Sequence, residues 1–320
     1  MIYSISGSHL YRKAPTMDLF QLETFVAVAE TRSFSLAAKK MHRTQPAISQ
    51  AVRKLETEVG EPLLDRSSRN GNLTSAGELL LQYAEKLLNL RSEARGALTE
   101  LRQLQSGRLS IAANEFTCIY LLLVLEQFRR QCPMIKVAVQ RAFASHVPED
   151  VASHKVELGA ISYKPESPAL RSIAVYRDEL TFIVPPKHPL AGAKEVRIRE
   201  LGAESFVAHN VPSPWRQRVL EAFRRHKTPL NMEVEMPTIE AIKRFVAMGN
   251  GVALVPGICV DAELKRGDLV RVPVRELRFE RKLRLVYRRN STLSHAAQAF
   301  LKIVEATAQQ KRGRYVFEKE

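Results

Sequence analysis

Amide, hydroxyl and guanidinium side chains recur at helical spacing in one short stretch of the chain. Gln45, Ser49 and Arg53 are four residues apart, so an α-helix places them on one face, with Gln50 and Lys54 beside them. Gln can pair with adenine and Arg with guanine through two hydrogen bonds, and each such pair contributes about 1–3 kcal/mol of discrimination between bases. This face suits a helix that enters the major groove of DNA, although the same spacing also occurs on ordinary solvated helices.

Two short helices joined by a tight turn must position this face, between residues 33 and 64. Apolar residues at i, i+3, i+4 and i+7 mark the first helix: Phe34, Ala37, Ala38 and Met41. His42 and Arg43 form the turn, and Thr44 is placed to cap the second helix by accepting hydrogen bonds from its first amides. Pro46 lies in the first turn, where its missing N–H costs nothing. The predicted buried residues of the second helix are Ile48, Val52, Leu55 and Val59.

A polar loop between two short apolar runs follows the second helix, over residues 63–74. It predicts a β-hairpin, or wing, on which Arg66 and Arg69 can reach phosphates or the minor groove. Ser33 and Ser35 are candidates for phosphate contacts, but Ser35, like Thr44, can equally be a helix cap. The candidate DNA-contacting residues are Ser33, Ser35, Thr44, Gln45, Pro46, Ser49, Gln50, Arg53, Arg66, Arg69 and Thr74.

In this order the motifs resemble the winged helix-turn-helix of LysR-type transcriptional regulators. The residues that carry the resemblance are Ser33-Phe34, Ala37-Ala38, Gln45-Pro46-Ala47-Ile48-Ser49, Leu55-Glu56, Leu63-Leu64, Arg66 and Leu73-Thr74-Ser75-Ala76-Gly77. The combination is specific, although no single motif is, and the resemblance extends from about Met17 to about Ala308. Residues 1–16 precede the usual start of the family, so we expect a disordered extension there or a start of translation at Met17.

From residue 75 to residue 106 the chain contains no Pro, and apolar residues alternate spacings of three and four. The residues of this heptad seam are Leu80, Tyr83, Leu87, Leu90, Ala94, Ala97, Leu101 and Leu104. A helix with such a stripe must bury it, against either a second copy or the rest of its own chain. Sustained heptads favour a second copy, and the resemblance implies the same, because the family pairs this helix in its dimers. A dimer predicts a two-fold symmetric DNA site with half-sites about one helical turn, or a multiple of it, apart.

Length and composition limit the classes of protein to consider. The 320 residues exceed one typical domain, and the contents of hydrophobic residues (45%) and charged residues (26%) are ordinary for a globular protein. No apolar run is long enough to span a membrane, and the N-terminus lacks the apolar core of a signal peptide. Cys118, Cys132 and Cys259 form neither a metal-ligand spacing nor an even disulfide framework, so we expect reduced thiols and a cytoplasmic location.

The formal charge of +15 is concentrated outside the predicted DNA-binding region. Residues 1–106 hold 14 Lys and Arg against 11 Asp and Glu, whereas residues 107–320 hold 35 against 23. The excess in the second part can attract DNA non-specifically or an anionic ligand, but a basic solvated surface is the simpler explanation.

Beyond Gly107 short strands alternate with helices, which indicates an α/β fold with a mostly parallel sheet. Two strands are expected within residues 171–185, and a late strand at 282–287 precedes a closing helix at 294–308. Landmarks at residues 128–133, 187–190 and 249–256 resemble the effector domain of the same family. The resemblance implies two α/β subdomains, like those of periplasmic binding proteins, with a ligand cleft between them.

The predicted organisation is therefore α/β, with an all-α winged helix-turn-helix domain at residues 17–74 and a long linker helix at 75–106. A two-subdomain effector domain follows at 107–310. Its first subdomain comprises residues 107–180 and 276–310, and its second comprises 181–275. Residues 311–320 are expected to be a tail.

Candidate effector-binding residues lie at strand ends and helix starts. The turn Asn114-Glu115-Phe116-Thr117 leads into a helix whose first amides can bind an anion, although the carboxylate of Glu115 disfavours one. The family often uses a hydroxyl residue here, a role that the resemblance carries to Thr117. The remaining candidates lie where open α/β sheets bind ligands, and each can instead be structural: Arg141, His146, His209, Ser213 and Thr238.

An enzyme and a solute-binding protein are the rival classes. The sequence has no phosphate-binding P-loop, zinc-protease motif, nucleophile elbow or dinucleotide fingerprint, so we expect no enzyme and no cofactor or metal. A solute-binding protein would need an export signal and no winged helix. We therefore predict a LysR-type regulator that binds double-stranded promoter DNA as a homo-oligomer, a dimer or a tetramer, and senses a small-molecule effector. RNA polymerase is a further expected partner, and a membrane is not.

Overall fold

The structure, a computed structural model, describes residues 17–65, 72–102, 107–211 and 213–319. It divides into two compact units, residues 1–95 and 96–320, which are treated separately here. Within the described ranges, no helix has both the length and the apolar character that a membrane crossing requires.

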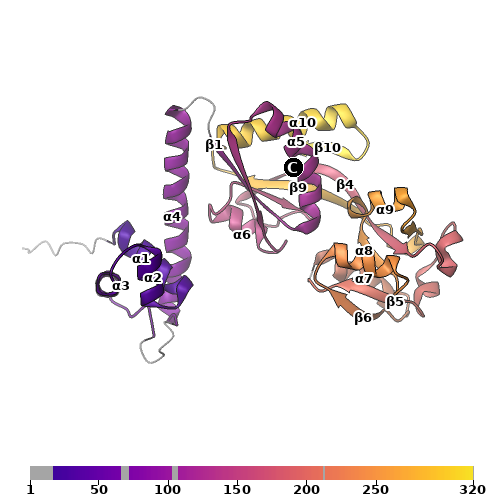
Figure 1. Ribbon diagram of the computed structural model, residues 1–320, viewed down its shortest axis with the longest axis horizontal. Helices are drawn as coiled ribbons and strands as arrows, with labels where there is room; N and C mark the ends of the chain where they lie inside the picture. The colour runs from indigo at the N-terminus through magenta and orange to yellow at the C-terminus, as the bar shows by residue number, and fades with distance from the viewer. Residues whose placement is uncertain (1–16, 66–71, 103–106, 212, 320) are drawn as a thin grey trace, which may run out of the picture. The chain divides into compact units, whose positions relative to one another are not determined.

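The first unit is a bundle of three short helices and one long one (Figure 1). Its helices are α1 (Leu19–Thr31), α2 (Phe34–Lys40), α3 (Gln45–Val59) and α4 (Ser75–Arg102). Asp18 and Gln21 form a reciprocal capping box that starts α1, and Gly60, with φ of 82°, ends α3. The core contains Leu22, Phe25, Val28, Ala37, Ile48, Val52 and Leu55, all buried. Val59, expected to be buried, is 39% exposed because it lies in the last turn of α3, beyond the contact with α1.

Backbone hydrogen bonds hold the segment after α3 against that helix. Buried Glu56 accepts hydrogen bonds from the amides of Leu63 (3.0 Å) and Leu64 (3.3 Å). Leu64 and Leu73 form an antiparallel bridge, the only pairing of the predicted wing within the described residues, since residues 66–71 lie outside them. Gly77 is required at the start of α4, because an added Cβ would lie 2.1 Å from the carbonyl oxygen of Leu63.

Helix α4 has two apolar faces with different surroundings. One face packs on the core of the first unit through buried Ala84 and half-buried Leu80, Leu81 and Leu88. Arg91 on the same side forms an ion pair with Glu23 of α1. A second stripe faces solvent: Leu79, Tyr83, Leu87, Leu90 and Leu98. The predicted seam is therefore corrected at Leu80, which is oriented toward its own domain.

The second unit alternates strands and helices in two lobes. Its elements are β1 (Gly107–Ala113), α5 (Glu115–Gln131), β2 (Ile135–Arg141), α6 (Val147–Ala152), β3 (Leu158–Ile161), β4 (Leu170–Val184), β5 (Ser205–His209), α7 (Pro214–Arg225), β6 (Asn231–Met236), α8 (Ile239–Ala247), β7 (Ala253–Pro256), α9 (Asp261–Arg266), β8 (Val270–Arg271), β9 (Glu280–Arg288), α10 (His295–Lys311) and β10 (Tyr315–Lys319). Short 3₁₀ turns lie at Pro189–Gly192, Ile198–Leu201, Gly257–Cys259 and Arg275–Leu277.

The main sheet of the first lobe has the strand order β10-β4-β9-β3-β1-β2. It is mixed rather than mostly parallel: β1 pairs in parallel with β2 and β3, whereas β9 and β4 pair antiparallel with their neighbours. The late strand β9 thus returns to the first lobe, as predicted. Strand β4 is a single 15-residue strand where two were expected, because its second half continues into the other lobe and pairs with β7 and β8.

The last residues also differ from expectation, since Tyr315–Lys319 form strand β10 rather than a tail. This strand pairs antiparallel with β4, and Tyr315 packs edge-on against Tyr176 at 5.1 Å between ring centroids. The pairing covers the edge of β4, which explains why the segment is ordered.

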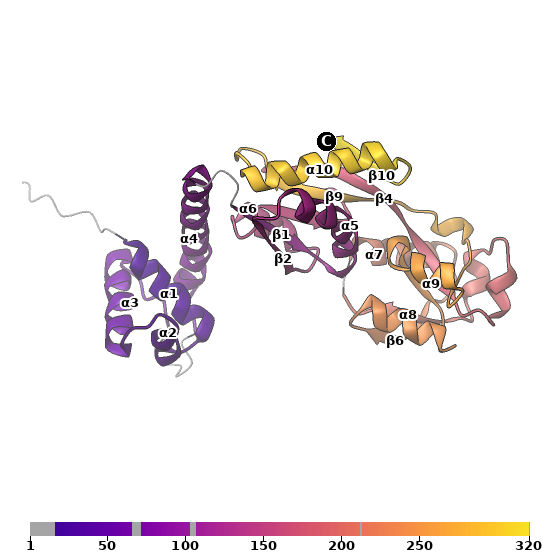
Figure 2. The same ribbon diagram turned by 45° about the horizontal axis from the view of Figure 1, so that its top comes forward.

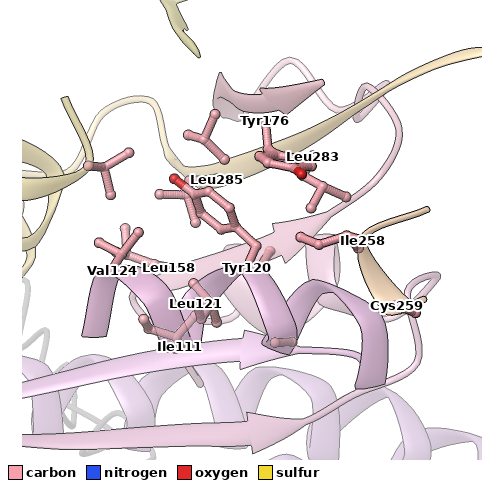
Figure 3. Packing of buried hydrophobic residues seen from close by; sticks show 14 of the residues in the cluster. Ile111, Tyr120, Leu121, Val124, Leu158, Tyr176, Ile258, Cys259, Leu283 and Leu285 are labelled. Carbon is pink, nitrogen blue, oxygen red and sulfur yellow. The ribbon is translucent and has the colours of Figure 1, made fainter. Parts of the chain in front are cut away.

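The core of the first lobe lies between the sheet and helices α5 and α10, which Figure 2 shows running along the sheet. Figure 3 shows Leu121 and Val124 of α5 beside Ile111, Leu158 and Leu285 from the strands. The opposite face of the sheet packs on α6. The second lobe has its own core around Phe182, Phe206 and Phe223.

Candidate DNA interface and effector cleft

The polar face of α3 is presented to solvent. Gln45, Gln50, Arg53 and Lys54 are exposed and Ser49 is half-buried, while Ile48, Val52 and Leu55 anchor the opposite side. Thr44 occupies the N-cap position, but its side chain makes no capping hydrogen bond, contrary to expectation. Its hydroxyl therefore belongs to the same exposed surface, together with Pro46 in the first turn.

The other predicted DNA contacts fall into three groups. Ser33 caps α2 by accepting a hydrogen bond from the amide of Leu36 (3.3 Å), so Ser35 is not the cap and is exposed in the first turn. The hydroxyl of Thr74 donates to the carbonyl of Pro62 (2.6 Å) and accepts from the amide of Gly77 (3.0 Å), which makes it a structural cap of α4. Arg66 and Arg69 lie outside the described residues.

A cavity of about 150 Å³ lies between the two lobes of the second unit. Six of the predicted effector contacts line it: Asn114, Glu115, Phe116, Arg141, His209 and Ser213. They come from the ends of β1, β2 and β5 and from the starts of α5 and α7. The rule that ligands bind where strands end therefore locates this cleft.

Three predicted effector contacts do not line the cavity. Thr117 is fully buried, and its hydroxyl is hydrogen-bonded within the capping box of Asn114 and donates to the carbonyl of Ala160 (3.1 Å). Thr238 caps α8 by accepting from the amide of Ala241 (3.1 Å). His146 precedes α6, where its ring packs edge-on against Phe143. Each of these side chains contacts its own local structure instead of the cavity. The residue type alone does not predict this.

Glu115 joins the two lobes across the mouth of the cleft. Its carboxylate oxygens accept from the amide of Ile239, the first residue of α8, at 3.1 and 3.2 Å. The N-terminus of α8, a natural anion site, thus holds a carboxylate of the protein itself. His209 lies 3.9 Å from the same carboxylate, and burial lowers the pKa of His209 although Glu115 opposes this shift.

The innermost charged group of the cleft was not predicted. Arg281 on β9 is 2% exposed and lies directly opposite Asp178 of β4, with Nε 3.4 Å from Oδ2. Burial lowers the pKa of Arg281 and raises that of Asp178, while their mutual attraction opposes both shifts. Strand alternation is the signal that could have found it, because Arg281 shares a face with buried Leu283 and Leu285.

Aromatic side chains form much of the remaining wall. Trp215, the only tryptophan, reaches from α7 to donate its indole N–H to the carbonyl of Ser162 (3.1 Å) in the first lobe. Phe116 and Trp215 contact the guanidinium of Arg281, with Cζ 5.0 and 5.4 Å from their ring centroids. Among the described residues, no cluster of His, Cys, Asp or Glu is arranged to hold a metal ion.

A helix-turn-helix with a solvent-facing polar helix, joined to a two-lobed domain with a ligand-sized cleft, defines a DNA-binding regulator that responds to a small molecule. Two family models match these parts. Residues 19–78 match the bacterial regulatory helix-turn-helix protein of the lysR family, and residues 102–309 match the LysR substrate binding domain. The chain belongs to the LysR family of transcriptional regulators.

Individual proteins resemble the chain over most of its length. A probable RuBisCO transcriptional regulator of Synechocystis sp. is 33% identical over 296 residues, which cover 90% of this chain and 85% of the relative. The crystal structure of full-length CbnR complexed with its target DNA has a TM-score of 0.69 at 21% identity, covering 91% of this chain and 100% of that one. The regulatory domain of Synechocystis CcmR in complex with 2-PG has a TM-score of 0.59 at 25% identity, covering 63% and 97%.

Proposed function

We propose that the exposed face of α3 reads promoter DNA in the major groove. Gln45, Ser49 and Arg53 supply base or backbone contacts, and Thr44, Pro46 and Gln50 flank them at the start of the helix. Ser35 in the first turn of α2 is available for a phosphate, whereas Ser33 and Thr74 act through the helices they cap. The exposure of this polar face on a well-anchored helix carries the proposal.

We infer that the protein acts as a homo-oligomer paired through α4. Tyr83, Leu87, Leu90 and Ala94, together with Leu79 and Leu98, are exposed along one side of this helix. An apolar stripe with spacings of three and four over five turns is characteristic of a coiled-coil partner helix. The predicted positions Ala97 and Leu101 have undescribed side chains, and Leu104 lies outside the described residues.

The cleft of the second unit binds the effector in this proposal. Asn114, Glu115, Phe116, Arg141, His209 and Ser213 line its cavity, and the solved complex of CcmR with 2-PG supports a ligand in this domain. Ligand binding changes how the two lobes are positioned relative to each other, which shifts the subunits of the oligomer. The shift alters the bend of the DNA or the spacing of the half-sites that the oligomer contacts. The protein is then a regulator rather than an enzyme, works in the cytoplasm where promoter DNA is, and acts on transcription through contact with RNA polymerase.

Selection of DNA from a random pool by the full-length protein tests the proposal. The expected result is one motif with two-fold symmetry and half-sites about one helical turn, or a multiple of it, apart. Sedimentation of the same preparation should give a dimer or tetramer. Selection of no motif, or a monomer bound to a single half-site, would contradict the proposal.

A further inference from the structure

Of the described cations that line the cleft, Arg281 alone is fully buried, and its hydrogen-bonding capacity is largely unused. Among the described residues, no acceptor forms a hydrogen bond with Nε or Nη2. Among the described residues its ion-pair partner is Asp178, whose Oδ1 accepts from the amide of Ile258 (3.1 Å) while Oδ2 also lacks a hydrogen bond. Buried polar groups in this state are uncommon and call for an explanation.

The other charged groups of the cavity are either engaged or nearer to solvent. Arg216 pairs with Glu235 and donates to the carbonyl of His209 (2.8 Å), and Glu115 is held on the amide of Ile239. Arg141 is exposed at the rim. An anion that enters the cleft therefore finds its inner hydrogen-bond donors on Arg281 and not at the N-terminus of α8.

The remaining lining restricts the rest of the ligand. Phe116 and Trp215 lie against Arg281, and Leu180, Phe206, Met232 and Leu254 add further apolar lining to the same cavity. Such a wall favours an apolar or aromatic body next to the group that Arg281 binds, while Arg141 and Arg216 lie in other parts of the lining. Asp178 and Glu115 already place two carboxylates in this region, so a dianion would meet more repulsion than a monoanion.

We propose that the effector is a monocarboxylate with an apolar or aromatic body, and that Arg281 binds its carboxylate group. This inference rests on the proposed effector role of the cleft and specifies the chemical class of the ligand. A planar guanidinium matches a carboxylate through two parallel hydrogen bonds, a geometry that Lys cannot reproduce.

A matched set of probes tests the inference by calorimetry on the full-length protein. The set comprises phenylacetate, phenylacetamide and benzylphosphonate, with propionate, propionamide and ethylphosphonate as smaller-bodied counterparts. We expect phenylacetate to bind about tenfold or more tightly than both of its isosteres and more tightly than propionate. Arg281→Lys should weaken phenylacetate about tenfold, whereas Arg171→Lys, an exposed control on β4, should not change it.

A second variant covers the case in which Arg281→Lys does not fold. Phe116→Leu leaves the guanidinium in place and removes one ring, so it should lower the preference for phenylacetate over propionate while the preference for carboxylate over amide persists. Binding of the phosphonates, or of phenylacetate unaffected by Arg281→Lys, would overturn the inference and leave the cleft as a ligand site. If no probe bound at millimolar concentration, the inference about the ligand class would be overturned, whereas the proposed function would stand or fall on the DNA selection and sedimentation experiments.

Discussion

Two arginines that face opposite environments show how the two units of this protein differ. Arg53 is exposed on α3, in water, where its charge is screened and where, in the proposed function, DNA supplies its partner. Arg281 is buried in the cleft, where one carboxylate at 3.4 Å accompanies it and aromatic rings replace water. The exposed group can be changed without affecting the fold, whereas the buried group is part of the domain's stability.

The two sites also differ in how many segments build them. One helix supplies the proposed DNA-reading face, and the residues that fix this helix lie on its opposite side. The cleft takes residues from α5, β2, β5, α7 and β9, among other elements, and several of them also hold the lobes together, as Trp215 and Glu115 do. We therefore expect substitutions on α3 to separate function from stability, and substitutions in the cleft to couple them.

The largest expected difference between the two regions is in stability. Asp178→Ala leaves Arg281 buried without its counter-charge and should lower the free energy of unfolding by about 3–5 kcal/mol. Arg53→Ala should change it by less than about 0.5 kcal/mol. Urea denaturation of the two full-length variants measures both. Equal stability of the two would mean that the buried pair does not hold the cleft together.

Helix α4 allows the same comparison between its two faces. Leu90→Asp, on the exposed stripe, should shift the protein toward monomer in sedimentation at a concentration where the parent is a dimer. At a concentration low enough for both proteins to be monomers, the variant and the parent should have the same helix content and melting temperature. Leu80→Ala removes a contact to the core of the first unit, so it should lower stability by up to about 2 kcal/mol and leave association intact. The reverse pattern would contradict the assignment of the faces.

The hydrogen bonds between Glu115 and the amide of Ile239, which join the lobes, should contribute less to stability. Glu115→Gln retains one acceptor for the amide of Ile239 but loses the charge, and the loss of stability should be about 1 kcal/mol. The pKa of His209 should fall further, because the carboxylate that opposes its lowering is gone. Nuclear magnetic resonance titration of the His209 ring measures this, and an unchanged or raised pKa would argue against the contact.

The smallest effect is the dependence of stability on pH that His209 causes. Its pKa is lowered in the folded state, so below about pH 6.5 the unfolded chain binds a proton that the folded chain does not. Stability should therefore fall as the pH falls from 6.5 through the lowered pKa of the folded state. His209→Gln should flatten the curve of unfolding free energy against pH in this window, and an unchanged slope would show that another group is responsible.

The sequence predicts a site well when its residues lie in one segment or at a position where ligands commonly bind in the fold. The face of α3 is readable because Gln45, Ser49 and Arg53 share one segment, and helical periodicity alone determines which side they occupy. The mouth of the cleft is readable because ligands of α/β folds bind beyond the ends of strands, and Asn114, Arg141 and His209 lie at the ends of strands of the two lobes.

The interior of the cleft needed information that no single segment contains. Strand alternation can place Arg281 on the buried face of its strand, but its position opposite Asp178 follows only from the register of β9 against β4, a pairing over a hundred residues apart in the chain. Thr117, which is buried and does not line the cavity, and Thr74 are predicted contacts for a related reason: a hydroxyl beside a helix start serves a ligand or a cap equally well by sequence. The structure gives both hydroxyls backbone partners, the carbonyls of Ala160 and Pro62.

The central claim is that the outward face of α3 contacts the bases of DNA. Its most direct test is the equilibrium affinity of Gln45→Ala for the duplex selected by the parent protein, measured by fluorescence anisotropy, with Gln131→Ala at the exposed end of α5 as a matched control. The account predicts a loss of about 1–3 kcal/mol in binding free energy, roughly fivefold to more than a hundredfold, with oligomeric state and melting temperature unchanged. An affinity equal to that of the parent and the control would contradict it.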